Sequence, residues 1–113
     1  MHEMALAENV LEIVEQARGR DGFHRVRTLR LEIGQLASVE PDAMRFCFEA
    51  AARGSVAAGA NLEIVEIAGA AWCDVCARRV ALAELGAACP RCGGYRLRVV
   101  EGAEMRVKEL EVE

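Results

Sequence analysis

Four of the five cysteines stand in two Cys-x-x-Cys pairs, Cys73–Cys76 and Cys89–Cys92, with twelve residues between the pairs. A Cys-x-x-Cys turn directs two sulfurs at one point, and a hairpin that joins two such turns creates a tetrahedral set of four thiolates. Structural zinc prefers this ligand set. The pattern therefore predicts a zinc site formed by Cys73, Cys76, Cys89 and Cys92, with Gly93-Gly94 supplying the positive φ of the second turn.

The same four cysteines admit other interpretations. Two disulfides are disfavoured because nothing in the sequence marks secretion. A rubredoxin-like electron carrier would hold iron in the same cage, and the purified protein would then be red. A zinc-ribbon module that binds nucleic acid or another protein would also share the cysteines. A nucleic-acid module needs a basic face with aromatic residues, however, and the net charge of −4, with only Trp72 and Tyr95 near the cysteines, opposes it.

Composition indicates where the protein is located and how its cysteine-bearing segment folds. No apolar run approaches the roughly 18 residues of a membrane span, and the start of the chain lacks the charged and apolar regions of a signal peptide. The expected location is the cytoplasm, where thiols stay reduced. The cysteine-bearing segment has few large apolar residues, so we expect it to depend on its metal ion for folding.

Hydrophobic periodicity predicts an α+β chain in the order helix, strand, helix, strand, cysteine-bearing module and strand. The expected helices are 4–18 and 41–53, and the expected strands are 25–33, 62–67 and 105–112. A zinc-ribbon-like domain is inserted before the last strand, with short strands at 80–82 and 95–100. The predicted domains are therefore 1–68 plus 103–113, and 69–102.

Several finer features are also predicted. Gly19 should end the first helix and Gly54 the second. The apolar alternation slips before Thr28, which suggests a bulge or twist there. Cys47 lies on the apolar stripe of the second helix and is interpreted as a core residue.

Catalytic chemistry is not indicated. No nucleophile, base and orienting group stand in a recognisable arrangement, and there is no phosphate-binding glycine loop and no HExxH sequence. His24 precedes a strand without a ligand partner at helical spacing, and it is interpreted as a solvated turn residue. We therefore expect a protein that is not an enzyme.

His2 has a more specific chemical alternative. A histidine at position 2 is most often only an exposed end residue. However, the Met1 amine, the amide nitrogens of His2 and Glu3, and the His2 imidazole can close successive chelate rings. Four nitrogens in a plane suit Ni(II) or Cu(II) and do not suit zinc.

Together these residues resemble the HypA/HybF family of hydrogenase maturation proteins, which are nickel metallochaperones. The resemblance runs along essentially the whole chain. It is carried by Met1-His2-Glu3, Leu31–Leu36, Val39-Glu40-Pro41, Arg45–Glu49, the two cysteine pairs and Arg106–Val112. Two small departures are Ala5, where serine is common in the family, and Ala77, where glycine is common.

The resemblance implies an α+β fold in which a nickel domain, two helices packed on a small three-stranded sheet, carries an inserted zinc-ribbon-like domain. It implies Ni(II) as cargo on His2, with the Met1 amine and the Glu3 backbone, and structural zinc on Cys73, Cys76, Cys89 and Cys92. It further implies delivery of nickel toward the large subunit of [NiFe] hydrogenase, together with the nickel GTPase HypB. A homodimer is compatible with the sequence, which does not fix the oligomeric state.

Overall fold

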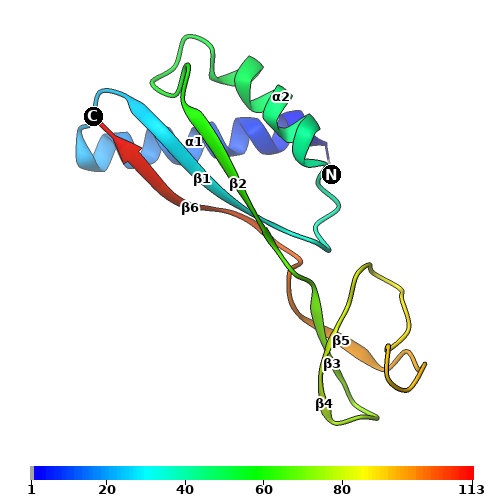
Figure 1. The fold of residues 1–113 in the computed structure, drawn as a ribbon. Helices are drawn as coiled ribbons and strands as arrows, with labels where there is room; N and C mark the ends of the chain where they lie inside the picture. Colours follow the sequence, from blue (N-terminus) through cyan, green and yellow to red (C-terminus); the bar gives the residue numbers. More distant parts are fainter. Residues whose placement is uncertain (1) are drawn as a thin grey trace. The chain divides into compact units, whose positions relative to one another are not determined.

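The structure, a computed structural model, describes residues 2–113. In this part of the chain the element order is α1 (Glu3–Asp21), β1 (Val26–Gly34), α2 (Pro41–Ala52), β2 (Asn61–Ile67), β3 (Ala70–Cys73), β4 (Arg78–Ala81), β5 (Leu97–Glu101) and β6 (Met105–Val112). The strands form two three-stranded sheets, ordered β2-β1-β6 and β4-β3-β5. The predicted α+β class, with two helices on a three-stranded sheet and a smaller unit around the cysteines, is confirmed (Figure 1).

The first sheet is mixed in direction. The amide of Val26 donates to Val56, and the amide of Gln35 donates to Ile67, so β1 and β2 run parallel. α2 connects them as the crossover of a β-α-β unit. In contrast, Arg25 exchanges two backbone hydrogen bonds with Glu113 while Gly34 donates to Glu104, so β6 runs antiparallel to β1. Figure 1 shows β1 between β2 and β6.

The chain divides into two compact units, and each unit is made of segments that are separated in the sequence. One unit contains residues 1–31, 39–65 and 106–113, and the other contains residues 32–38 and 66–105. Segment 32–38, the end of β1 and the turn after it, thus packs with the cysteine-bearing residues. The predicted domain bounds at 69 and 102 stay a prediction about which part of the chain folds independently.

The helical unit has a core built from regularly spaced small and branched residues. In α1 the buried side chains are Ala7, Val10, Val14 and Ala17, which recur every three or four residues on one face. In α2 they are Met44, Phe48 and Ala52, while Cys47 is half-buried beside them. These faces and the buried residues Leu29 and Leu31 of β1 make up this core.

Both predicted helix ends are wrong by a short distance. α1 continues through Gly19 to Asp21, and Gly22 ends it with φ 69° and an amide bond to the Arg18 carbonyl. A glycine within a helix is tolerated, and the left-handed conformation at Gly22 is what stops it. α2 ends at Ala52 because Arg53 leaves the helix with ψ 130°, before Gly54 is reached.

A phase change was predicted before Thr28, but it lies one position later in β1: Val26 and Thr28 are buried in alternation, and Thr28 and Leu29 are then consecutive and both buried. From Leu29 onward the buried residues alternate, so Arg30 lies on the face opposite the helices. A strand at Ala70–Cys73, β3, was not predicted. Its alanines carry little strand signal, yet β3 is the central strand of the second sheet. Within the described residues neither helix combines the length and apolar character of a membrane span.

Candidate metal centre

The four predicted zinc ligands meet at one point. The Sγ atoms of Cys73, Cys76, Cys89 and Cys92 all lie within 4.8 Å of one another, and all four are free thiols. The Cys73 and Cys92 sulfurs are 3.8 Å apart, and those of Cys76 and Cys89 are 3.9 Å apart. Four sulfurs at about 2.3 Å from a tetrahedral zinc ion would be roughly 3.8 Å from each other. The cage therefore fits zinc.

Two turns of similar conformation build the cage. In each, the residue after the second cysteine has a left-handed backbone, with φ 51° at Ala77 and φ 74° at Gly93. Backbone amides then point at sulfur: the amide of Cys76 donates to Cys73 Sγ, and that of Gly94 to Cys92 Sγ, both at 3.4 Å. These amides stabilise negative charge on the thiolates. The predicted positive φ is found at Gly93, and in the first turn Ala77 has a positive φ as well.

The cage is anchored on its buried side. Cys73 ends β3 and is fully buried, and Cys89 is 2% exposed, whereas Cys92 is exposed. The backbone amides of Cys92 and, to a lesser extent, Arg91 lower the pKa of Cys89 to about 7. Burial raises the pKa of Cys76 to about 12, and hydrogen bonds from neighbouring thiols add to this. Cys89 therefore ionises more readily than Cys76 for an incoming cation.

Leu36 packs against this centre, which no pattern in the sequence predicted. Its side chain is 4% exposed and belongs to the apolar cluster of Ala71, Cys73, Val80, Leu82 and Cys89. The surrounding turn is fixed by backbone bonds, because the amide of Leu36 donates to Gly102 at 2.7 Å. The Gln35 side chain accepts from the Gly69 amide at 2.9 Å. An isolated leucine in a turn carries no signal that it packs against cysteines nearly forty residues later in the chain.

The predicted nickel residues lie in the other unit. His2 is the N-cap residue of α1, with φ −78° and ψ 125°, and its side chain makes no capping hydrogen bond. It is exposed. The Glu40 amide donates to the Glu3 carboxylate at 3.3 Å, which lowers the pKa of Glu3, and the amide of Glu3 itself contributes further. The Met1 amine, the remaining predicted ligand, lies outside the described residues.

Glu40 links this end to α2. Its side chain accepts from the Asp42 amide at 3.2 Å and caps α2, which begins at Pro41. Its own amide holds Glu3, so the first turns of α1 and α2 are tied together. His24, in contrast, is exposed at a bend before β1, as predicted, and among residues 2–113 it belongs to no cluster of potential metal ligands.

Comparisons with known proteins agree with this geometry. A family model described as hydrogenase/urease nickel incorporation, metallochaperone, hypA, matches residues 1–112. Hydrogenase maturation factors HypA from Albidiferax ferrireducens and from Rhodopseudomonas palustris strain BisB5 are 59% and 56% identical to the chain, and each aligns over 100% of both chains. The fold is shared with the solution structure of the nickel metallochaperone HypA from Helicobacter pylori. That match has a TM-score of 0.74 at 23% identity and covers 99% of this chain and 97% of that one.

The family match spans nearly the whole chain, the curated relatives share more than half of its residues, and the fold agrees with a solved member. The protein therefore belongs to the HypA family of nickel-incorporating hydrogenase maturation factors.

Proposed function

We propose that this protein carries Ni(II) at its amino end, on the His2 imidazole, the amide nitrogens of His2 and Glu3, and the Met1 amine. The observation that supports this most directly is the placement of His2 at the N-cap of α1, where its imidazole is exposed and makes no capping bond. The first amides of a helix have no intrahelical carbonyl partner. Nickel can thus coordinate them without breaking the helix.

The neighbourhood of His2 favours a cation. The Glu3 carboxylate is ionised and held by the Glu40 amide, so negative charge is fixed next to the proposed ligands. The site is terminal and accessible, which suits an ion that is passed to another protein. We infer that the protein transfers its cargo and performs no reaction on an organic substrate.

Zinc has a separate, structural role in this proposal. Cys73, Cys76, Cys89 and Cys92 would hold it permanently, because two of the four sulfurs are buried and the cage is packed against Leu36. A tetrahedral set of four thiolates suits zinc, whereas a planar set of nitrogen ligands suits Ni(II). We infer a cytoplasmic location, because thiols stay reduced there. The proposed recipients are the nickel GTPase HypB and the large subunit of [NiFe] hydrogenase, with no nucleic acid among the partners.

Nickel titration of tag-free protein by calorimetry tests the amino-terminal site. We expect one nickel ion per chain in the wild type and loss of this binding in His2→Ala, with zinc content and circular dichroism unchanged. His24→Ala is the matched control, since His24 is the only other histidine and is also exposed. Because the imidazole and the amine must be deprotonated to bind, nickel affinity should decrease as the pH is lowered. Unchanged nickel binding in His2→Ala would refute the site.

A further inference from the structure

The second sheet has a buried face and an exposed face. In this sheet β3 lies between β4 and β5 (Figure 1), and Trp72 of β3 stands opposite Arg79 of β4 and Arg98 of β5. Residues directly opposite each other on neighbouring strands point to the same side of a sheet. All three side chains are exposed. On the exposed face the Trp72 indole is therefore flanked by one guanidinium group on each side.

The buried face is the one that supports the cysteine cage. Side chains alternate along a strand, so Ala71 and Cys73 point away from the face of Trp72. Both are fully buried, and they pack with Val80 of β4 in the apolar cluster that surrounds the cysteines. Trp72 does not belong to that cluster. The exposed face can therefore be altered without removing a metal ligand or a core side chain.

A third arginine belongs to the exposed face. The Asp74 amide donates to the Arg96 carbonyl at 3.0 Å, which continues the pairing of β3 beyond its last registered residues. Positions 74 and 96 lie two residues from 72 and 98, and two steps along a strand return to the same side. Trp72 is thus surrounded by Arg79, Arg96 and Arg98. We call these four residues the arginine–tryptophan face.

The guanidinium groups of this face have donors to spare. Arg98 Nη2 donates to the Asp74 carboxylate at 3.3 Å, and Arg79 Nη2 donates to the Glu101 carboxylate. These four side chains are about half exposed or more, and ion pairs at such sites contribute little to stability. Arg96 makes no ion pair with any residue from 2 to 113. Since each guanidinium carries five N–H donors, all three arginines can bind further acceptors.

A hollow of about 350 Å³ adjoins the arginine–tryptophan face. Its lining includes Arg79, Glu101, Ala70 and Ala81. Ala70 and Ala81 stand opposite each other on β3 and β4, and they contribute only methyl groups. Another chain can therefore approach this part of the sheet closely. The hollow leaves room for a carboxylate side chain next to the Arg79 guanidinium.

We propose that the arginine–tryptophan face binds an acidic segment of a partner protein. Carboxylates of the segment pair with the three arginines, and an apolar side chain of the segment packs on Trp72. Tryptophan and arginine are the residues that most often dominate binding at protein interfaces. In addition, the planar guanidinium group matches a carboxylate through paired hydrogen bonds.

Nucleic acid is the other polyanion that such a face could attract. The chain as a whole has a net charge of −4, which repels a long polyanion that must pass over much of the surface. A short acidic segment needs to contact only this face. Charge therefore favours the acidic segment over nucleic acid.

Trp72 is the only tryptophan of the chain, so its indole N–H gives a single NMR signal that reports on this face. The probe is a short fluorescein-labelled peptide with glutamates on both sides of one leucine, and the control peptide has glutamine in place of each glutamate. In the zinc-loaded protein we expect the Trp72 signal to shift saturably with the glutamate peptide. No shift at millimolar peptide, or an equal shift with the glutamine peptide, overturns the proposal.

Fluorescence anisotropy of the labelled peptide tests the arginines. Arg79→Gln and Arg98→Gln should each raise the dissociation constant by about threefold to tenfold, because each removes charge-assisted hydrogen bonds. Arg53→Gln, the same change at an exposed site in the other unit, should leave binding unchanged. Zinc content verifies that the cage is intact in every variant. Peptide binding that is insensitive to both Arg79→Gln and Arg98→Gln refutes this face.

The same measurements identify other occupants. If an oligothymidylate bound more tightly than the glutamate peptide, with an affinity that fell steeply with salt, the face would be a nucleic-acid surface and the proposal would be wrong. A Trp72 signal that moved with protein concentration alone would assign the face to a second copy of the chain, which would also overturn it. Nickel titration of the Arg79→Gln/Arg98→Gln variant separates this proposal from the amino-terminal site, because neither arginine is a proposed nickel ligand.

Discussion

Ala77 adopts a backbone conformation that normally suits glycine, with φ 51° directly after the first cysteine turn. The equivalent position of the second turn is Gly93, with φ 74°. A left-handed conformation costs a residue with a Cβ roughly 1–2 kcal/mol, whereas glycine adopts it freely. The turn tolerates this strain because Cys73 and Cys76 are both fixed in the cage.

Ala77→Gly should therefore stabilise the zinc-bound protein by about 0.5–1 kcal/mol, the relief of strain being partly offset by the greater entropy of unfolded glycine. Denaturant unfolding at constant zinc measures the change. Ala83→Gly, in the same unit but without a positive φ, should destabilise it instead. A loss of stability in Ala77→Gly would show that the turn is not strained.

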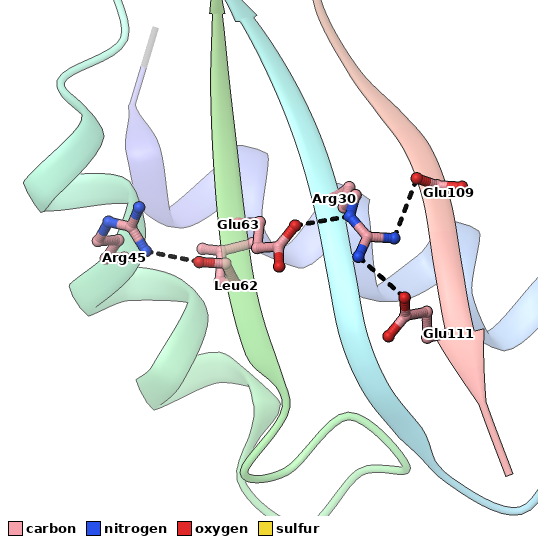
Figure 2. A network of polar contacts seen from close by, with 6 residues as sticks. All are labelled: Arg30, Arg45, Leu62, Glu63, Glu109 and Glu111. Atoms are coloured by element: carbon pink, nitrogen blue, oxygen red, sulfur yellow. Dashed lines mark hydrogen bonds and ion pairs between the residues drawn. The ribbon is translucent and has the colours of Figure 1, made fainter.

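Arg30 ties the three strands of the first sheet together. Its guanidinium donates to Glu63 of β2 at 2.6 Å, and to Glu109 and Glu111 of β6 at 3.0 and 2.8 Å (Figure 2). The hydrogen bond from Arg30 is the main cause of the lowered pKa of Glu111, and the bonds to Glu111 and Glu63 raise the pKa of Arg30. One planar donor thereby spans both neighbours of β1.

Arg30→Met should lower the thermal unfolding midpoint at neutral pH. A carboxylate whose pKa is lowered by folding contributes stability above its unfolded pKa and loses it as pH falls through the folded pKa. The difference between wild type and variant should thus shrink as pH drops below about 4. Arg27→Met is the control, because Arg27 of the same strand forms a longer ion pair with Glu113, at 3.7 Å, and both side chains are exposed. A difference that persists at pH 2 would contradict this account.

The turn after β1 belongs to the unit that contains the cysteines, because Leu36 packs against Cys73 and Cys89. Leu36→Ala should cost about 2–4 kcal/mol, because the side chain is buried among residues that surround the cysteines. Zinc should also be lost faster to a chelator, which a chromogenic zinc indicator can follow. Leu85→Ala, the same change at a side chain that is 61% exposed, should have little effect on either measurement. If both variants lost zinc to the chelator at the same rate, Leu36 would not stabilise the cysteine cage.

At the scale of the whole molecule, the two units should respond differently to metal removal. Structural zinc contributes apparent binding free energies of about 10–16 kcal/mol in small zinc modules. The unit of 66–105 buries few large side chains to replace that contribution, whereas α1 and α2 pack around Met44, Phe48 and Leu29.

Chelation of zinc should therefore remove hydrogen-exchange protection from β3 and β4 while α1 stays protected. The Leu36 amide should lose protection too, because its acceptor is the Gly102 carbonyl within the same unit. Exchange measured by NMR before and after chelation tests this. Protection that is lost throughout the chain, or kept throughout, would show that the units do not differ in their dependence on the ion.

Much of the architecture is encoded in local patterns. The spacing of Val10 and Val14, the alternation of Leu29, Leu31 and Ile33, and Pro41 as a first helical residue each predict an element that the structure contains. The cysteine pairs predicted a cage because a Cys-x-x-Cys turn is a local structure. The errors lie where local signals compete, as at Gly19, or are weak, as in the alanine-rich β3.

Amino-acid order alone thus predicted the cysteines that gather in one cage, both helices and the family. Only the tertiary structure decided that Leu36 packs with the cysteines, that Arg30 bridges β2 and β6, and that the Glu40 amide holds Glu3. The physical reason is range. Turns, helices and strands follow from neighbours a few residues apart, whereas these contacts join segments more than thirty residues apart, whose pairing depends on how the whole chain packs.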